Sequence, residues 1–244
     1  MLHKTKGIVL RTIKFGETSL VATLYTELFG LQNYLIKGIR QQSKKGGSKA
    51  NMFQPSAILN LVVYHNELKQ LQIIKEMSWS LVYQHILSDV LKNAVALFMV
   101  EMIAKSIKEP ENNPDLFEWI EQQLVFLDAA NPSATANFPI HFAWAFSGQL
   151  GFAVEGNYML QTPILDLQEG IFTSNAPQHA NYITEEIAEK TSLFIHYQSV
   201  LDTTGIPLNR LQRREMLNSA ILFYQYHIPD FGTLKTIDVL NAIF

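Results

Sequence analysis

The sequence of 244 residues contains no cysteine. This absence excludes disulfide bonds, thiolate chemistry and any zinc site that depends on cysteine ligands. The longest run of strictly apolar residues, 94–100, is far too short to cross a bilayer. The N-terminus lacks the apolar core of a signal peptide. We therefore expect a cytoplasmic protein that makes no contact with membranes.

Sequence motifs of enzymes are also missing. There is no HExxH motif, no GxSxG elbow, no GxxxxGK[ST] loop and no GxGxxG after a strand. The seven histidines do not occur at metal-ligand spacings, and helix capping explains the acidic group Glu185, Glu186 and Glu189. We therefore predict a binding protein with no catalytic residue, metal or cofactor.

Acidic residues are absent from 28–66, although this stretch holds five basic ones. Residues 1–78 contain eleven Lys or Arg and four Asp or Glu, a net charge of +7. The rest of the chain contains eight basic and eighteen acidic residues, a net charge of −10. Such an asymmetry favours a module that binds a polyanion, joined to a part with another role. The alternative is a solvated basic loop that only keeps the protein in solution.

Residues 7–76 have the pattern of short β-strands. Five runs rich in β-branched and apolar residues lie near 8–13, 19–26, 32–39, 58–64 and 68–74. In the last run apolar and polar residues alternate, as expected for a strand with one buried face. Five short strands in about 75 residues fit a small barrel better than an open sheet, which would expose its edges.

From residue 78 onwards the apolar residues recur with a helical period. We predict helices over 79–107, from Pro114, over 140–150, from Thr184, over 209–226 and over 236–243. Residues 152–181 are rich in Asn, Gln, Thr, Pro and Gly and are expected to form an irregular excursion. The predicted fold class is α+β and multidomain, a barrel followed by an all-α part.

The barrel and its basic loop are candidates for contact with nucleic acid, because cations can follow a phosphate backbone while aromatic rings stack on bases. Tyr34 and Phe53 flank the basic stretch, but a place in the barrel core is the favoured explanation for both. Five cations on a single strand predict a log–log salt slope of roughly −3.5. The predicted contacts are Lys37, Arg40, Lys44, Lys45 and Lys49, followed by Arg11 and Lys14 as a second tier.

A second basic feature lies near the C-terminus. Arg210, Arg213 and Arg214 follow i, i+3, i+4 spacing and share one face of a predicted helix. Beside apolar side chains, such a stripe could hold an acidic peptide tail. Ordinary ion pairing with neighbouring Glu or Asp is the alternative explanation.

Several motifs together resemble the RecO family of bacterial recombination mediators, which act in DNA repair. The motifs lie at both ends of the chain, in order and at suitable distances: Gly7–Leu20, Thr26–Leu31, Lys37–Arg40 with Ser43-Lys44, Arg213–Leu217, Tyr224–Gly232 and Leu234–Ile237.

The resemblance implies an N-terminal OB-fold, here residues 1–78, and a C-terminal helical domain, here residues 79–244. It implies binding to single- and double-stranded DNA, annealing of complementary strands, and partnership with RecR and single-stranded DNA-binding protein to help load RecA. It places Lys37, Arg40 and Lys44 in the family's DNA-facing region, whereas Lys45 and Lys49 depend on the charge argument alone. It implies neither ATP nor catalysis, and a protein associated with the nucleoid.

One departure from the family concerns zinc. Many members carry a four-cysteine zinc module in the helical domain, and the corresponding region, about 152–181, has no cysteine in this chain. We expect apolar packing by Leu165, Leu167, Ile171 and Phe172 in its place. Two other functions stay open, an OB-fold RNA-binding module and an interaction scaffold whose basic loop contacts an acidic protein.

Overall fold

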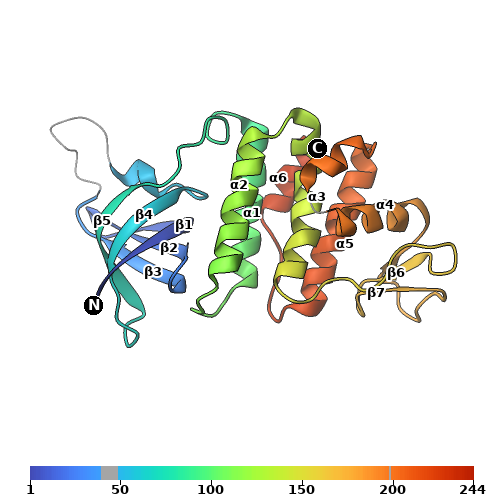
Figure 1. Ribbon diagram of the computed structural model, residues 1–244, viewed down its shortest axis with the longest axis horizontal. Helices are drawn as coiled ribbons and strands as arrows, with labels where there is room; N and C mark the ends of the chain where they lie inside the picture. The colour runs from blue at the N-terminus through green and yellow to red at the C-terminus, as the bar shows by residue number, and fades with distance from the viewer. Residues whose placement is uncertain (40–48, 198) are drawn as a thin grey trace. The chain divides into compact units, whose positions relative to one another are not determined.

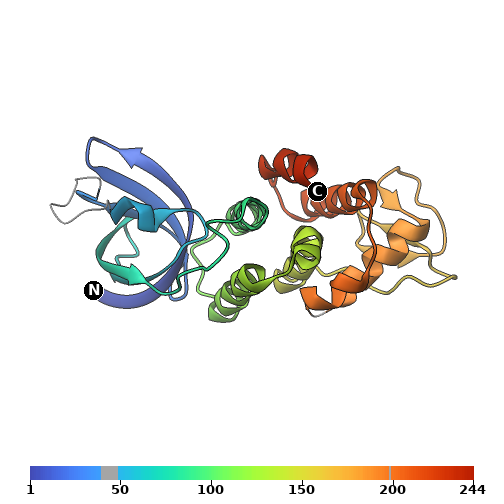
Figure 2. The same ribbon diagram turned by 90° about the horizontal axis from the view of Figure 1, so that it is seen from above.

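The computed structural model describes residues 1–39, 49–197 and 199–244. The chain divides into two compact units, Met1–Ala129 and Ala130–Phe244 (Figures 1 and 2). Among the described residues, no helix is both long and apolar enough to cross a membrane.

The first unit begins with a closed five-stranded barrel, drawn in blue to teal in Figure 1. Its strands are β1 (Leu2–Phe15), β2 (Ser19–Thr26), β3 (Gly30–Ile36), β4 (Ile58–Tyr64) and β5 (Leu71–Trp79). They are hydrogen-bonded in the order β1-β2-β3-β5-β4, and β4 pairs with β1 to close the barrel. The β3–β5 pair is parallel and the others are antiparallel. This arrangement confirms the predicted barrel and is OB-like.

Strand β1 closes the barrel because it pairs with a neighbour on each side. Its first half, from Leu2 to Ile8, pairs with β4, and its second half, from Gly7 to Phe15, pairs with β2. The register shifts between Val9 and Arg11, and such bulges bend a strand. A Cβ atom at Gly7 would lie 2.9 Å from Cδ1 of Leu61, so a larger residue there would require the Leu61 side chain to shift.

The core of the barrel is built from the inward side chains of its strands, which alternate with exposed ones. Tyr34 and Phe53 belong to this core, with exposed fractions of 0% and 2%. Phe53 ends the short 3₁₀ helix η1 (Lys49–Phe53). Burial raises the pKa of Tyr34 well above its ordinary value. These two rings are therefore core residues, as the favoured explanation predicted, and are not available to stack on a ligand.

The helix predicted from Trp79 begins eleven residues later, and this part of the prediction is wrong. Helix α1 spans Val90–Ser106, and Asp89 caps it by accepting hydrogen bonds from two backbone amides. The preceding segment is held in a non-helical shape by the Asp128 carboxylate, which accepts from the amides of residues 84–86 at 2.8–2.9 Å. Burial raises the pKa of Asp128, but the three amide donors outweigh it and hold the pKa below its usual value.

Helix α2 (Pro114–Ala129) begins where the Asn-Pro-Asp sequence predicts. The Asn113 side chain accepts from the Leu116 amide. In the first unit α2 also contacts the barrel: Nζ of Lys6 on β1 donates to both carboxylate oxygens of Glu121, at 3.0 and 2.8 Å. The rings of Tyr25 and Phe117 stack with centroids 6.0 Å apart.

The second unit is mainly helical. Its elements are α3 (Pro132–Gln149), α4 (Glu185–His196), the 3₁₀ helix η2 (Val200–Gly205), α5 (Arg210–His227) and α6 (Thr236–Ile243). Helix α3 begins eight residues before the predicted start, because Asn131 caps it with Pro132 at the first helical position. Pro139 lies inside α3 and has no backbone N–H to donate to the preceding turn of the helix. Most side chains of α3 are buried, and this packing offsets the missing hydrogen bond.

The excursion between α3 and α4 contains a small three-stranded sheet in the order β7-β6-β8. The strands are β6 (Ile164–Asp166), β7 (Ile171–Thr173) and β8 (Tyr182–Ile183). Of the four predicted packing residues, Leu165, Leu167 and Phe172 are buried, whereas Ile171 is exposed.

The donor set of this excursion does not fit a structural zinc ion. The Asp166 carboxylate lies 3.3 Å from Nε2 of His179, and no third metal-ligating side chain joins them among the described residues. A structural zinc ion requires four such ligands.

Candidate nucleic-acid interface

The outer face of the barrel carries a groove of about 480 Å³ across β1, β2, β3 and β5. Strand alternation brings Arg11, Ile13 and Phe15 of β1 to this face, and Arg11 pairs with Thr23 of β2 in the register. On the other side of β2, Thr23 pairs with Asn33 of β3 and donates to its side-chain oxygen at 2.7 Å. The complete lining is Arg11, Ile13, Phe15, Val21, Thr23, Asn33, Gln70 and Leu71.

The charge of this face is positive. Among the described residues that line the groove, Arg11 is the charged one and none is acidic. Lys37 is exposed directly after β3, in sequence alternation with Leu35 of the outer face. Lys14 is exposed too, although alternation directs it to the other side of β1. These three predicted contacts share the barrel surface, and in the described part of the chain none of them has an ion-pair partner.

The remaining predicted contacts cannot be placed on this surface. Arg40, Lys44 and Lys45 lie outside the described residues, and Lys49 is the first residue of η1. Their part in binding nucleic acid stays a prediction that follows from the charge pattern of the sequence.

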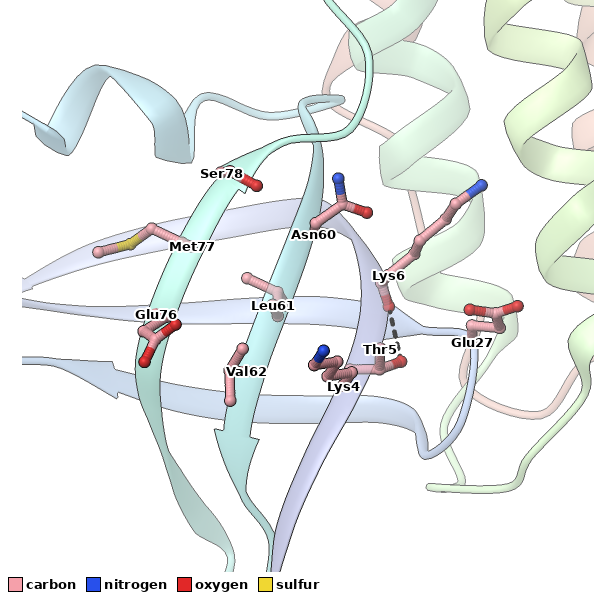
Figure 3. A pocket seen from close by; sticks show the side chains of 10 residues that line it. All are labelled: Lys4, Thr5, Lys6, Glu27, Asn60, Leu61, Val62, Glu76, Met77 and Ser78. Atoms are coloured by element: carbon pink, nitrogen blue, oxygen red, sulfur yellow. Dashed lines mark hydrogen bonds between the residues drawn. The ribbon is translucent and has the colours of Figure 1, made fainter.

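A second groove of the barrel, of about 460 Å³, has a different character (Figure 3). It lies over β1, β4 and β5, where Lys4 and Glu76 flank Val62 in the strand register. Glu27 also lines it, and Lys6 at its edge is paired with Glu121. Because opposite charges alternate along this groove, it does not favour a polyanion.

The three arginines of α5 separate into two groups. Nη2 of Arg210 donates to the carbonyl oxygens of Asn241 and Ala242, at 2.9 and 3.1 Å, and so caps the end of α6. Arg213 and Arg214 instead line a small apolar groove of about 10 Å³ between α3, α5 and α6. Within the described residues none of the three forms an ion pair, so the ion-pairing explanation does not hold there. The groove is lined by Ala136, Pro139, Ile140, Arg213, Arg214, Leu217, Leu240, Asn241 and Phe244.

The side chain of Arg213 is fixed by a hydrogen bond to Asn137 of α3. Its Nε donates to Oδ1 of Asn137 at 3.1 Å, and the Asn137 amide nitrogen donates to the Thr203 carbonyl at 2.9 Å. Asn137 is 1% exposed. Burial lowers the pKa of the Arg213 guanidinium from its ordinary value.

Sequence reasoning missed two features of these surfaces. Phe15 lies in an ordinary strand pattern, and only the barrel geometry shows that its ring is directed outwards with 53% of its surface exposed. Asn137 lies before residue 140, where the sequence predicted that this helix would begin. Its helical position and its bond to Arg213 become apparent only when α3 and α5 are packed together.

The barrel topology, the basic outer face and the helical second unit define a class, the multidomain α+β proteins with an N-terminal OB-like barrel. Comparison with known protein families narrows this class. The model for "Recombination protein O N terminal" matches residues 1–82, and the model for "Recombination protein O C terminal" matches residues 87–163. The chain belongs to the RecO family, as the resemblance of its motifs predicted.

Individual relatives agree with this assignment. DNA repair protein RecO of Christiangramia forsetii is 32% identical over 249 residues, and that of Bacteroides fragilis is 32% identical over 246 residues. DNA repair protein RecO of Flavobacterium johnsoniae is 30% identical over 244 residues. In all three alignments the whole of this chain and the whole of the relative are covered.

Proposed function

We propose that this protein binds single- and double-stranded DNA, anneals complementary strands and, with RecR, helps to load RecA on DNA coated by single-stranded DNA-binding protein. The observation that supports this proposal best is the groove beside Arg11, which carries positive charge and no carboxylate among its described lining residues. In this proposal residues 1–78 bind DNA and residues 79–244 serve partners. The protein acts in the cytoplasm at the nucleoid.

The proposed annealing mechanism is electrostatic. Two single strands repel each other through their phosphates, and a surface with many cations lowers this repulsion while it holds both strands nearby. Contacts with phosphate carry no base information, so the preference for sequence is weak. No bond is made or broken, and the chemistry requires neither a cofactor nor a catalytic residue.

The test is charge reversal in the basic loop. The variant in which Lys44, Lys45 and Lys49 are replaced by Glu loses strand annealing, measured as the rate at which two labelled complementary oligonucleotides pair. The control variant reverses Lys4, Lys105 and Lys235, which changes the net charge equally but at scattered positions, and it keeps most of the activity. Unchanged annealing in the first variant overturns the site. A preference for RNA over DNA of equal length favours the RNA-binding alternative instead.

We further propose that the groove beside Arg213 and Arg214 holds the acidic tail of single-stranded DNA-binding protein. The groove has a volume of only about 10 Å³, and Ile140 and Leu240 in it are each 1% exposed. A peptide would therefore lie across its rim, where the two guanidinium groups suit carboxylates and the partly exposed Ala136 and Phe244 offer apolar contact. Because Asn137 fixes Arg213, little side-chain entropy is lost when a carboxylate binds.

This second proposal is tested by peptide binding. Replacing Arg214 with Glu lowers the affinity for a fluorescent acidic peptide by about tenfold or more, since one charge-assisted hydrogen bond becomes a repulsion. Replacing Lys105 and Lys108 with Gln makes an equal change of net charge outside the groove, serves as the control and has little effect. Equal peptide affinity in the Arg214 variant and the wild type removes this groove as the tail site.

A further inference from the structure

Helix α6 is attached to the rest of the second unit by few of its own side chains. Leu240 is the buried residue of this helix, with 1% of its surface exposed, whereas Val239 beside it is 49% exposed. At the N-cap position, Lys235 makes no side-chain capping hydrogen bond to the helix. A helix of eight residues is too short to be stable by itself in water. The helical form of α6 therefore depends on its contacts with α3 and α5.

The side chain of Leu240 fills most of the apolar groove beside Arg213 and Arg214. Pro139, Ile140 and Leu217 line the groove together with it, and all of these side chains are buried. The volume of about 10 Å³ that stays open is about the space of one water molecule. If Leu240 moved away, the same apolar walls would form a pocket for one aliphatic or aromatic side chain.

The guanidinium group of Arg210 holds the C-terminal end of α6. Its Nη2 donates to the carbonyl oxygens of Asn241 and Ala242, and the side chain is exposed, so water competes for the same bonds. Helical spacing places Arg210 on the same face of α5 as Arg213 and Arg214. Displacement of α6 would therefore release a third guanidinium group next to the two that already line the groove.

We propose that α6 is a lid over this groove, and that an acidic peptide binds most tightly when α6 is displaced. In the closed form the peptide reaches only the rim of the groove. In the open form an apolar residue of the peptide occupies the pocket that Leu240 leaves, and its carboxylates meet all three guanidinium groups of α5. The inference rests on the proposed tail site and adds the regulation of that site.

The chemistry of α6 resembles that of the peptide which would replace it. Residues 236–244 are mostly apolar, and Asp238 is the charged residue among them. With α6 bound, Arg210 meets neutral backbone carbonyls, whereas a peptide with several aspartates offers carboxylates to Arg210, Arg213 and Arg214. A ligand shifts a conformational equilibrium only by the difference between its affinities for the two forms. The exchange therefore favours an acidic peptide and does not favour a neutral one of the same apolar character.

A first prediction from the lid concerns affinity. Replacing Leu240 with Ala weakens the closed form, and the apparent affinity for an Asp-Asp-Asp-Leu-Phe peptide rises by about tenfold, because the apparent affinity scales with the open fraction. Replacing the exposed Val239 with Ala, in the same helix, is the matched control and leaves the affinity unchanged. Replacing Arg210 with Gln lowers the affinity by about fivefold in the Leu240 variant and by less in the wild type, where it also loosens the lid. Fluorescence anisotropy measures all four proteins.

Hydrogen exchange in the unmodified full-length protein tests the displacement itself. A saturating amount of the acidic peptide is expected to speed exchange of the amides of residues 240–244 by about tenfold or more, because their hydrogen bonds within α6 are broken. An Asn-Asn-Asn-Leu-Phe peptide, which has the same apolar end and no aspartate, leaves their exchange unchanged. A peptide that only rests on the rim would slow this exchange or leave it as it is.

The outcomes separate the lid from the site that it covers. If the acidic peptide binds with dependence on Arg214, but α6 exchanges no faster, the lid is wrong and the tail site stands. An affinity of the Leu240 variant that is equal to or below that of the wild type also overturns the lid. If the wild type and the Leu240 variant both fail to bind the acidic peptide, the proposed tail site itself is overturned.

Discussion

Arg11 on the barrel and Arg213 on α5 carry the same guanidinium group in opposite surroundings. Arg11 lies on an open face, exposed and without an ion pair among the described residues. Arg213 is partly buried beside apolar side chains, and Asn137 fixes its orientation. An exposed, adaptable cation suits a flexible chain of phosphates, whereas a fixed one suits a single carboxylate in a defined place. In our proposal, the two units therefore place positive charge for two kinds of anion.

The largest predicted difference between the two surfaces is in how their binding affinities depend on salt concentration. With about five phosphate contacts, the affinity of the barrel for single-stranded DNA falls roughly 100-fold between 50 and 200 mM salt. Binding of an acidic peptide to the α5 groove falls far less, about threefold, because fewer charges are involved and apolar contacts contribute. Fluorescence anisotropy across one salt series measures both. Equal salt slopes for the two ligands would contradict the division of roles.

A second prediction uses pH to weaken one unit selectively. Burial lowers the pKa of His141 on α3 to about 4 from 6.5, although Asp202 acts in the opposite direction. The unfolded chain then binds a proton more readily than the folded one. The free energy of unfolding is therefore highest above about pH 6.5 and decreases as the pH falls towards 4. At pH 5 it is about 2 kcal/mol lower than at neutral pH.

This loss is measured by urea unfolding of the second unit at about pH 7.5 and pH 5, followed by the fluorescence of Trp144. The measurement uses a variant whose other tryptophans are replaced by Phe, so that only this unit gives the signal. Replacing His141 with Phe in the same background removes the pH dependence that this residue causes. Replacing the exposed His85 with Gln is the control and leaves it in place. A His141 variant with an unchanged pH profile would show that this imidazole is not the cause.

The smallest predicted effect concerns the support of Arg213. Replacing Asn137 with Ala removes the acceptor for Nε of Arg213, and the affinity for an acidic peptide falls by about fivefold, or 1 kcal/mol. Binding to single-stranded DNA stays the same. The side chain of Ser147, another buried polar residue of α3, donates to the Trp144 carbonyl of the same helix, so its replacement by Ala is the control for stability. A fivefold loss in both variants would point to general unfolding instead.

The sequence predicted the parts of this protein that depend on local pattern. The alternation of side chains gave the strands of the barrel, and the Asn113-Pro114 pair marked the start of α2. The helix expected from Trp79 failed because Asp128, more than forty residues away, binds the amides of residues 84–86. A contact over that distance leaves no periodic signal near Trp79.

For the candidate sites too, the sequence predicted what depends on local pattern and missed what depends on packing. Charge asymmetry indicated a basic barrel without any knowledge of its topology. The direction of the Phe15 ring, however, depends on how β1 twists past its bulge, and the use of Arg210 as a cap for α6 depends on the packing of two helices. Helical spacing alone makes the three arginines equivalent, since it describes a single helix and not its neighbours.

The way in which Gln72 holds the β4–β5 turn has a practical consequence. Its hydrogen bonds reach only backbone atoms of Asn66 and Lys69, so that the shape of the turn does not depend on the side chains at 67–69. These three positions can therefore be exchanged without rebuilding the loop. A photo-crosslinking or fluorescent amino acid at position 68 would report directly on whatever molecule passes this end of the barrel.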